Sequence, residues 1–579
     1  MKQLLIGNAA VARGAYEAGV RVVASYPGTP STEITEEIVR YEDVYAEWAP
    51  NEKVACEVAV GAAIGGARAM TCMKHVGLNV MADPVFTASY TGVNGGLVLC
   101  VADDPGMHSS QNEQDSRHYA RAAKLPMLEP ADSAECRDYT KLAFELSEQY
   151  DTPVFIRLST RVSHSQSLVE LQEREEVPLK DYEKNIGKYV MMPANAIRRH
   201  VTVEQRTEAL KQYAETCALN AVEGEGKKIG VITAGIAYMY AREALGDQAD
   251  YLKLGMVYPL PDELLKEFAA AHDVVYVIEE LDPFIEDACR ALGITNVRGK
   301  AEFTLLGEYT PAMIRKVVLG EDAPEKMSAD EPLPVRPPVM CAGCPHRGTF
   351  YVLKKLGLVV AGDIGCYTLG AVAPLQSVDT TICMGASVSA ALGMAKARGM
   401  EFNKKLVSVI GDSTFMHSGI TGLVDIVYNK GANTVIILDN SITGMTGHQE
   451  NPTTGYTIRG EETKQVNLIA LCKAIGVEHV TVADPFDVKN FEKVVKEEVE
   501  RDEPSVIIAQ RPCALLKRVK YTGVCKITDK CRNCKVCMKL GCPAITVKEG
   551  RVIIDQTQCN GCGLCTGVCP FGAIEKEEA

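Results

Sequence analysis

The chain has 579 residues, more than a single hydrophobic core usually supports, so we expect roughly four or five domains. A formal net charge of −14 argues against a general binder of nucleic acids or anionic membranes, since both need a basic protein surface. No apolar run approaches the roughly 20 residues that span a bilayer. The N-terminus lacks the layout of a signal peptide, so we expect a cytoplasmic protein.

The first predicted domain, residues 1–170, alternates apolar strands with helices, which is typical of an α/β fold. The run at 95–105 indicates a fully buried strand that ends in a polar loop, which is where parallel sheets place their ligands. Residues 51–71 predict a helix with a face of small residues, entered through a polar loop that contains Glu52.

Three segments lie between this domain and the next sheet of the same type. Residues 171–227 are rich in Glu, Lys and Arg at helical spacing and predict a solvated helical connection. Residues 228–320 predict a third α/β domain, with a strand, turn and helix at 227–245 and a buried strand at 273–283. Residues 321–339 are charged and proline-rich, as expected of a linker.

The domain expected at 340–519 contains two buried strands with polar residues at their ends. Gly411-Asp412-Ser413 ends one strand, and Asp439-Asn440 ends the next. The pair resembles the thiamine diphosphate signature, in which a GDG-type turn is followed about thirty residues later by Asn. Ser413 stands for the usual glycine and Asp439 for the usual first asparagine, so two ordinary α/β loops remain the alternative.

A Mg²⁺ ion on a diphosphate needs oxygen ligands from two adjacent strand ends, and a strand–helix–strand crossover brings such ends together. We expect the side chains of Asp412 and Asn440 and the carbonyl of Ile442 to be these ligands. In thiamine enzymes a glutamate hydrogen-bonds N1′ of the aminopyrimidine, and Glu52 occupies the matching place. Glu57 is the rival, and either glutamate could instead be a solvated helix residue.

The C-terminal segment, 520–579, predicts an α+β ferredoxin-like domain with two 4Fe–4S clusters. Eight of the 21 cysteines lie between Cys531 and Cys569, and the second run follows the bacterial ferredoxin spacing C-x2-C-x2-C-x3-C-P. The first run has one extra residue before Cys542, so Cys542 departs from the pattern. Structural zinc is the alternative, but zinc prefers two CxxC pairs for each ion. The predicted ligand sets are Cys531, Cys534, Cys537 and Cys569 for cluster one, and Cys559, Cys562, Cys565 and Cys542 for cluster two.

Further motifs extend along the whole chain in one order. They are SYPGTPSTE (25–33), MKHVGLNVMADP (73–84), SSQNEQDSRHYA (109–120), CAGCPH (341–346), DIGCYTLG (363–370) and GDSTFMHSGITGL (411–423). Together with the C-terminal cysteines they resemble the large subunit of indolepyruvate:ferredoxin oxidoreductases, within the 2-oxoacid:ferredoxin oxidoreductase superfamily. The resemblance implies two thiamine-diphosphate-binding parallel-sheet domains (pyrimidine-binding at 1–170, pyrophosphate-binding at 340–519) and a transketolase-C-terminal-like domain at 228–320.

The resemblance also implies roles for six residues of the first domain. Thr29 would lie near the thiazolium and the substrate, and His75 would line the same cleft, although a histidine there can also cap a strand end. Asp115 and Arg117 would shape the end of the pocket that receives the substrate carboxylate, with a surface ion pair as the alternative. The remaining two candidates line the cleft with His75 and are Lys74 and Asn79.

A third cluster close to the cofactor is a further implication. Related enzymes hold it with a CxxC, a cysteine in the following loop and a cysteine late in the domain. The matching positions here are Cys341, Cys344, Cys366 and Cys513. The alternative is a set of buried apolar thiols, which is our interpretation of Cys56, Cys72, Cys100 and Cys383.

The function implied is oxidative decarboxylation of aryl-2-oxoacids to aryl-acetyl-CoA and CO2, with electrons passed to ferredoxin. Coenzyme A would be the acyl acceptor, and a smaller β subunit would complete a heterotetramer of two large and two small subunits. One rival is a non-oxidative thiamine-dependent decarboxylase, which would need none of these cysteine sets. The other is an electron-relay subunit, against which the joint presence of Glu52, Asp412 and Asn440 argues.

Overall fold

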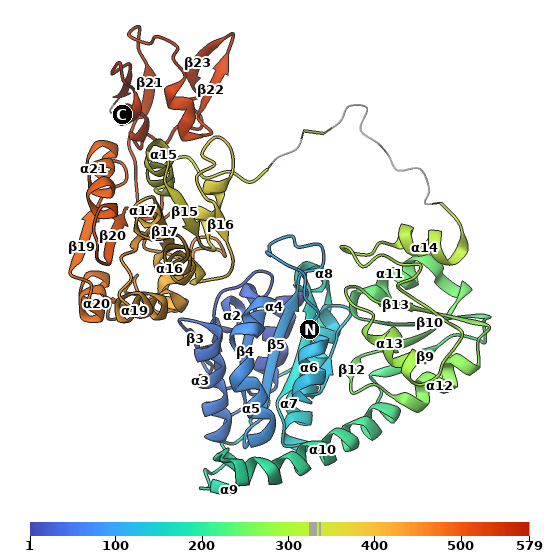
Figure 1. Cartoon of the computed structure of the whole chain (residues 1–579). Helices are drawn as coiled ribbons and strands as arrows, with labels where there is room; N and C mark the ends of the chain where they lie inside the picture. The colour runs from blue at the N-terminus through green and yellow to red at the C-terminus, as the bar shows by residue number, and fades with distance from the viewer. Residues whose placement is uncertain (323–332, 335–336, 578–579) are drawn as a thin grey trace. The chain divides into compact units, whose positions relative to one another are not determined.

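A computed structural model of the chain describes residues 1–322, 333–334 and 337–577 (Figure 1). The chain forms two compact units, Met1–Asp330 and Glu331–Ala579, which we describe separately. Most of the linker predicted at 321–339 lies outside the described residues. In the part of the chain that the structure describes, no helix has the length and apolar character needed to cross a membrane.

The first unit is built around a seven-stranded sheet with the strand order β12-β6-β7-β5-β4-β2-β3. All neighbouring strands are parallel except β12, which runs antiparallel to β6. In chain order the strands are β2 Val22–Ser25, β3 Tyr45–Trp48, β4 Ala69–Lys74, β5 Leu97–Asp103, β6 Met127–Leu128, β7 Val154–Ser159 and β12 Met256–Tyr258.

Helices cover both faces of this sheet, so its central strands are apolar without alternation. All seven residues of β5 are buried, as predicted for this run. The sheet is stable in this arrangement because the helices on each face bury their small and aliphatic side chains against its strands. One face carries α1 Gly7–Glu17, α2 Thr32–Ile38 and α7 Ser133–Gln149; the other carries α3 Glu52–Ile64, α5 Ala82–Thr91 and α6 Arg117–Ala123.

The segment predicted as a helical connection, 171–227, is helical only in part. It contains α9 Ile186–Tyr189, α10 Pro193–Thr216 and the strand β9 Asn220–Glu223. Residues 171–185 form neither helix nor strand, because their backbone N–H groups find acceptors on neighbouring segments: Glu175 N donates to Glu17 O (2.8 Å) and Lys180 N to Gly66 O (3.1 Å). The preceding strand β8, Gln166–Glu170, pairs with β1, Lys2–Ile6, apart from the main sheet.

A second sheet in this unit has the order β14-β13-β10-β11-β9, with only β9 antiparallel. It agrees with the α/β prediction for 228–320, but β12 leaves this segment to join the first sheet. One apolar core extends from α3 and α5 to α12 and β10, so the two sheets share it. The elements are β10 Ile229–Ala234, α11 Gly235–Leu245, β11 Asp250–Leu254, α12 Asp262–Ala270, β13 Val274–Ile278, α13 Phe284–Ala291, β14 Val297–Arg298 and α14 Pro311–Leu319.

The second unit contains a six-stranded, fully parallel sheet with the order β16-β15-β17-β18-β20-β19. Helices α15 His346–Leu356 and α21 Val488–Val499 cover one face, and α16 Ala386–Arg398, α19 Ile420–Tyr428 and α20 Leu468–Ile475 cover the other. The α/β prediction is therefore confirmed here too. The strands are β15 Val359–Gly362, β16 Thr380–Thr381, β17 Leu406–Gly411, β18 Thr434–Asp439, β19 His479–Ala483 and β20 Ser505–Gln510.

The C-terminal segment adds two antiparallel strand pairs to this unit. β21 Val524–Ile527 pairs with β24 Ile574–Glu577, and β22 Ile545–Lys548 pairs with β23 Arg551–Ile554. The helix α22 Leu564–Val568 lies between β23 and β24 in the chain. Its apolar side chains, such as Leu540 and Leu564, share one core with Leu353 of α15 and Phe491 of α21. The small module is thus packed directly on the parallel sheet domain.

Candidate functional site

Glu52 is the first residue of α3, and its side chain is buried. The helix begins here because the Asn51 side chain accepts a hydrogen bond from Val54 N (2.9 Å). Glu52 is 4% exposed, whereas the rival Glu57 is on the exposed face of α3, where it pairs with Lys53. A Cβ atom on Gly77 would lie 2.5 Å from Glu52 Oε1, so only glycine leaves room for this carboxylate. The geometry favours Glu52 over Glu57 as the functional glutamate.

The loop after β4 brings two predicted residues close to Glu52. Lys74 ends the strand, and its Nζ donates to Ser109 O (2.7 Å). Burial lowers the pKa of Lys74 to about 8, while the Asp104 and Glu52 carboxylates oppose that shift. The Lys74 stem also packs against Gly28, beside the predicted Thr29. Lys74, at the end of β4, therefore lies near both Glu52 at the start of α3 and the Gly28–Thr29 loop that follows β2.

His75 is the first residue of α4, His75–Val80, and is 1% exposed. Its Nε2 lies 3.1 Å from Asn112 O, and its buried Nδ1 has no partner among the described residues. Burial lowers the pKa of His75, which favours the neutral ring. Asn79 lies one turn further on and is exposed, with its Oδ1 accepting from Tyr119 Oη (2.6 Å). The exposed Asn79 therefore does not belong to the buried group formed by Glu52, Lys74 and His75.

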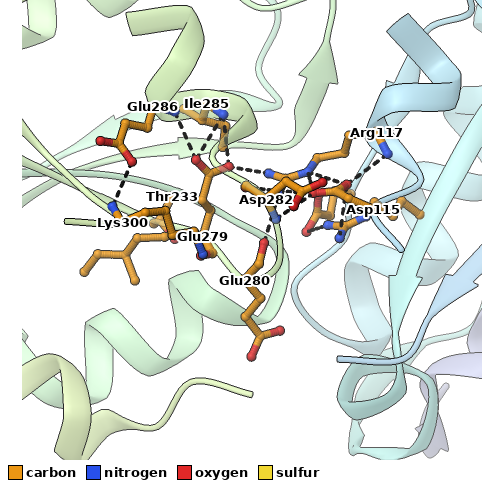
Figure 2. Close-up of polar contacts among 12 residues, drawn as sticks. Asp115, Arg117, Thr233, Glu279, Glu280, Asp282, Ile285, Glu286 and Lys300 are labelled. Carbon is orange, nitrogen blue, oxygen red and sulfur yellow. Dashed lines mark hydrogen bonds and ion pairs between the residues drawn. The ribbon is translucent and has the colours of Figure 1, made fainter. Parts of the chain in front are cut away.

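Asp115 and Arg117 lie in a buried network of charges (Figure 2). Arg117 donates to Asp115 through Nε (2.9 Å) and Nη2 (2.5 Å), and to Glu279 Oε2 through Nη1 (2.5 Å). Glu279 follows β13 and also accepts from the backbone N–H groups of Ile285 and Glu286, both at 3.0 Å. The alternative of a surface ion pair is wrong, since the pair is buried where the two sheets of the unit meet.

This network also bears on the role expected of the pair. Burial acts to raise the pKa of Asp115, but the Arg117 and Arg157 guanidinium groups hold this pKa below its usual value. Arg117 is 1% exposed, so a substrate carboxylate could reach it only if the network opened. Contact with substrate stays a prediction, and the geometry instead supports a structural role in joining the sheets.

In the second unit, the two predicted polar turns lie side by side. Gly411 of β17 pairs with Leu438 of β18, so Asp412 and Asp439 end adjacent parallel strands. Thr443 Oγ1 donates to Ser413 Oγ (2.9 Å), which gives the unusual Ser413 a function in tying the turns together. The helix begins at Asp412 with a short α-helical segment, Asp412–Thr414, and continues as a π-helix at Phe415–Gly419, a feature that the sequence did not indicate.

Asp412 has the surroundings of a cation ligand. It is 2% exposed, and its Oδ2 accepts from Thr453 Oγ1 (3.0 Å). Burial raises the pKa of Asp412 to about 7, and the nearby Asp439 carboxylate contributes to this rise. Asn440 is also buried, with its Oδ1 accepting from Ile442 N (3.3 Å). A divalent cation would relieve the repulsion of these carboxylates, so the donor set fits Mg²⁺.

The four cysteines predicted for a cluster near this turn are neighbours. Burial raises the pKa of the Cys344 thiol to about 12, and the nearby Cys366 and Cys341 thiols act in the same direction. Burial likewise raises the pKa of Cys366 to about 11, with Cys513 and Cys341 adding to it. These mutual effects connect all four thiols, which supports the predicted set. Of the thiols interpreted as buried, Cys56, Cys72 and Cys100 are buried, but Cys383 is exposed and that interpretation of it is wrong.

The C-terminal cysteines line two separate cavities. One contains Cys531, Cys534, Cys537 and Cys569, and the other contains Cys542, Cys559, Cys562 and Cys565. Each group is one predicted ligand set, so the extra residue before Cys542 does not remove it from its partners. Four convergent thiols fit a 4Fe–4S cluster.

Cys525 also lines the second of these cavities, and the cysteine spacing did not predict it. It is 1% exposed on β21, and its N–H donates to Cys559 Sγ (3.3 Å). Its position six residues before Cys531 is outside the ferredoxin spacing, so the sequence held no signal for it.

Three family models match the chain. "Pyruvate flavodoxin/ferredoxin oxidoreductase, thiamine diP-bdg" matches residues 13–227, "Thiamine pyrophosphate enzyme, C-terminal TPP binding domain" matches 363–509, and "4Fe-4S binding domain" matches 552–575. The first match contains Glu52, and the second contains Asp412. The chain thus has thiamine-diphosphate-binding domains and a C-terminal 4Fe–4S domain.

Curated relatives match over the full length. Indolepyruvate oxidoreductase subunit IorA of Archaeoglobus fulgidus is 41% identical over 619 residues, covering 100% of this chain and 98% of the relative. The same subunit of Pyrococcus horikoshii is 40% identical, covering 99% and 97%. That of Methanothermobacter marburgensis is also 40% identical, covering 99% and 97%.

Proposed function

Because the chain belongs to the family of indolepyruvate oxidoreductase subunit IorA, we propose that it is the large subunit of a thiamine-diphosphate-dependent indolepyruvate:ferredoxin oxidoreductase. The reaction is oxidative decarboxylation of an aryl-2-oxoacid to aryl-acetyl-CoA and CO2, with electrons leaving through 4Fe–4S clusters to ferredoxin. The observation that carries the proposal is the full-length match together with buried Glu52 and Asp412 in the matched thiamine domains.

The chain's own residues have distinct tasks in this proposal. Thiamine diphosphate, when bound, supplies the electron sink that decarboxylation needs. Glu52 would hydrogen-bond N1′ of the bound aminopyrimidine and could move a proton there, in a pocket whose shape Gly77 permits. Asp412 and Asn440, with the carbonyl of Ile442, would hold a Mg²⁺ ion that binds the diphosphate.

Lys74 and His75 are the residues that we assign to the substrate. With its pKa lowered to about 8, the buried Lys74 ammonium can pair with a carboxylate and still release a proton near neutral pH. The neutral His75 ring has its Nδ1 available to hold or release a proton. Thr29, from the loop beside Lys74, completes this group.

We further propose three 4Fe–4S clusters, two in a ferredoxin-like C-terminal module and one at the CxxC of the parallel sheet domain. The convergence of twelve cysteines into three groups supports this number. It also argues against a non-oxidative decarboxylase, which has no use for clusters. A smaller β subunit, coenzyme A and ferredoxin are the expected partners, in a heterotetramer of two large and two small subunits. The segment at 228–320 would be the transketolase-C-terminal-like domain.

The test is anaerobic reduction of a viologen dye by the chain with its smaller subunit, an arylpyruvate and coenzyme A. Dye reduction that requires coenzyme A supports the proposal. Accumulation of an aldehyde without coenzyme A would favour the decarboxylase. Failure to bind thiamine diphosphate would favour the electron-relay subunit.

Iron analysis tests the cluster assignment separately. We expect about twelve irons per chain, and about eight would exclude the third cluster. Cys542→Ala should lose about four irons, whereas Cys525→Ala should lose none. The reverse result would make Cys525 the ligand and Cys542 the bystander.

A further inference from the structure

The CxxC loop of one proposed cluster forms part of the wall around another. Ala342 and Gly343, between Cys341 and Cys344, line the cavity that contains Cys542, Cys559, Cys562 and Cys565. Asn560 Nδ2 donates to Ala342 O (3.0 Å). Gly343 has a φ of 74°, and a Cβ atom there would lie 2.3 Å from Asn560 Nδ2, so only glycine permits this contact. A single loop therefore separates the two sets of cysteines that we assign to different clusters.

Arg347 lies at this boundary and lines the same cavity. It is 2% exposed, and its guanidinium donates to Leu540 O (2.9 Å), Gly541 O (2.5 Å), Cys341 O (3.2 Å) and Met340 O. Met340 and Cys341 belong to the CxxC loop, whereas Leu540 and Gly541 precede Cys542. The side chain thus holds the loops of both cysteine groups, and all four of its acceptors are neutral carbonyls.

A buried guanidinium needs a counter-charge, because burial of an unpaired ion is strongly unfavourable. Among the residues that the structure describes, Arg347 forms no ion pair with a carboxylate. Instead, its Nε donates to Cys341 O (3.2 Å), and it lines the cavity that contains Cys542 and Cys562. These cysteines belong to both proposed cluster sites. A 4Fe–4S cluster with four thiolate ligands carries net negative charge, so the missing counter-charge would come from the clusters.

We propose that Arg347 is a shared counter-ion of two clusters, the one at Cys341, Cys344, Cys366 and Cys513 and the one at Cys542, Cys559, Cys562 and Cys565, and raises the reduction potential of both. The inference rests on the proposed function, since it requires both clusters to assemble. Reduction adds one electron and one negative charge to a cluster, with no bond or proton change. A fixed positive charge in a poorly solvated site favours that state. Arg347 is therefore a positioning residue for electron transfer and does not touch the substrate.

The test is a redox titration of the iron-loaded chain, followed by electron paramagnetic resonance. Arg347→Gln should lower the ratio of reduced to oxidised cluster at a fixed potential on the order of tenfold, or about 59 mV for a one-electron couple, at two of the three signals. Arg347→Lys keeps the charge and should stay close to the parent chain. Arg501→Gln is the matched control, because Arg501 pairs with Glu498 before β20 and should shift no signal.

Each other outcome decides the question. If Arg347→Gln shifts neither signal, or if the lysine and glutamine variants shift both equally, the charge has no such role and the proposal is overturned. If only the lysine variant loads iron, the need for a positive charge is supported. If neither variant loads iron, the hydrogen bonds of the guanidinium matter rather than its charge, and the proposal fails. A parent chain with about eight irons would instead remove the third cluster itself.

Discussion

Asp412 should make the affinity for Mg²⁺ and thiamine diphosphate depend on pH. Its carboxyl group has a pKa raised to about 7 by burial and by Asp439, and a carboxylate must be deprotonated to bind a metal ion. The proton and the cation therefore compete for the same oxygen atoms. Because deprotonation favours the cation, affinity should rise as the pH rises through 7.

The size of this effect follows from the pKa. At pH 8 about one carboxyl in eleven is protonated, and at pH 6 about ten in eleven are. The apparent affinity should therefore fall about tenfold between pH 8 and pH 6, which corresponds to about 1.4 kcal/mol. Calorimetric titration of the anaerobic chain with thiamine diphosphate at a fixed Mg²⁺ concentration measures it directly.

Asp412→Asn is the reference for this measurement. The cofactor's own phosphate titrates near pH 6, so part of any pH dependence belongs to the ligand. The variant keeps the shape of the side chain and removes its titration, so it should bind more weakly and retain only the phosphate's contribution. An equal pH dependence in parent and variant would refute the reasoning.

Three further substitutions, two of them with a matched control, test the first unit. Glu52→Gln should lower viologen reduction by about 10²-fold or more while the cofactor still binds, whereas Glu57→Gln, on the exposed face of α3, should keep full activity. Gly77→Ala should also lower activity, because the added Cβ atom would displace the Glu52 carboxylate. Its control is Gly61→Ala in α3, where no atom lies within 4 Å of the added Cβ and activity should be unchanged. Equal losses in the two variants would refute this account. Arg117→Gln breaks the buried ion pairs with Asp115 and Glu279 and leaves Asp115 only the longer contact with Arg157 (3.7 Å), so it should destabilise the first unit by about 3–5 kcal/mol in chemical unfolding. A loss below about 1 kcal/mol would mean that the network contributes little.

The features that sequence predicted well are those that depend on local pattern. A strand covered by helices on both faces is apolar throughout, so β5, β17 and β18 were evident as runs. Cysteine spacing reflects the wrapping of one loop around a cluster, and in the ferredoxin pattern the fourth cysteine of each run ligates the other cluster. This pattern divides the eight cysteines between Cys531 and Cys569 into the two sets that line separate cavities.

The features that sequence did not predict depend on partners far along the chain. Arg117 contacts Glu279, which lies 162 positions later in the chain, and Arg347 contacts Leu540, which lies 193 positions later. The periodicity of a sequence does not predict such contacts. The absence of helix at 171–185 has the same origin, because a charged segment with helical spacing still follows whichever backbone acceptors lie beside it. Cys525 reaches its cavity through the pairing of β21 with β24, which no cysteine motif describes.

The antiparallel pairing of β12 with β6 has a practical consequence for dissecting this protein. β6 has only two residues, and β12 supplies its outer hydrogen-bonding partner from a segment more than a hundred positions later. A fragment that stops at residue 227 would therefore expose a bare sheet edge together with apolar core that α12 and β10 normally cover. Such a fragment should self-associate in solution, while one that ends after α14 should remain monodisperse by light scattering.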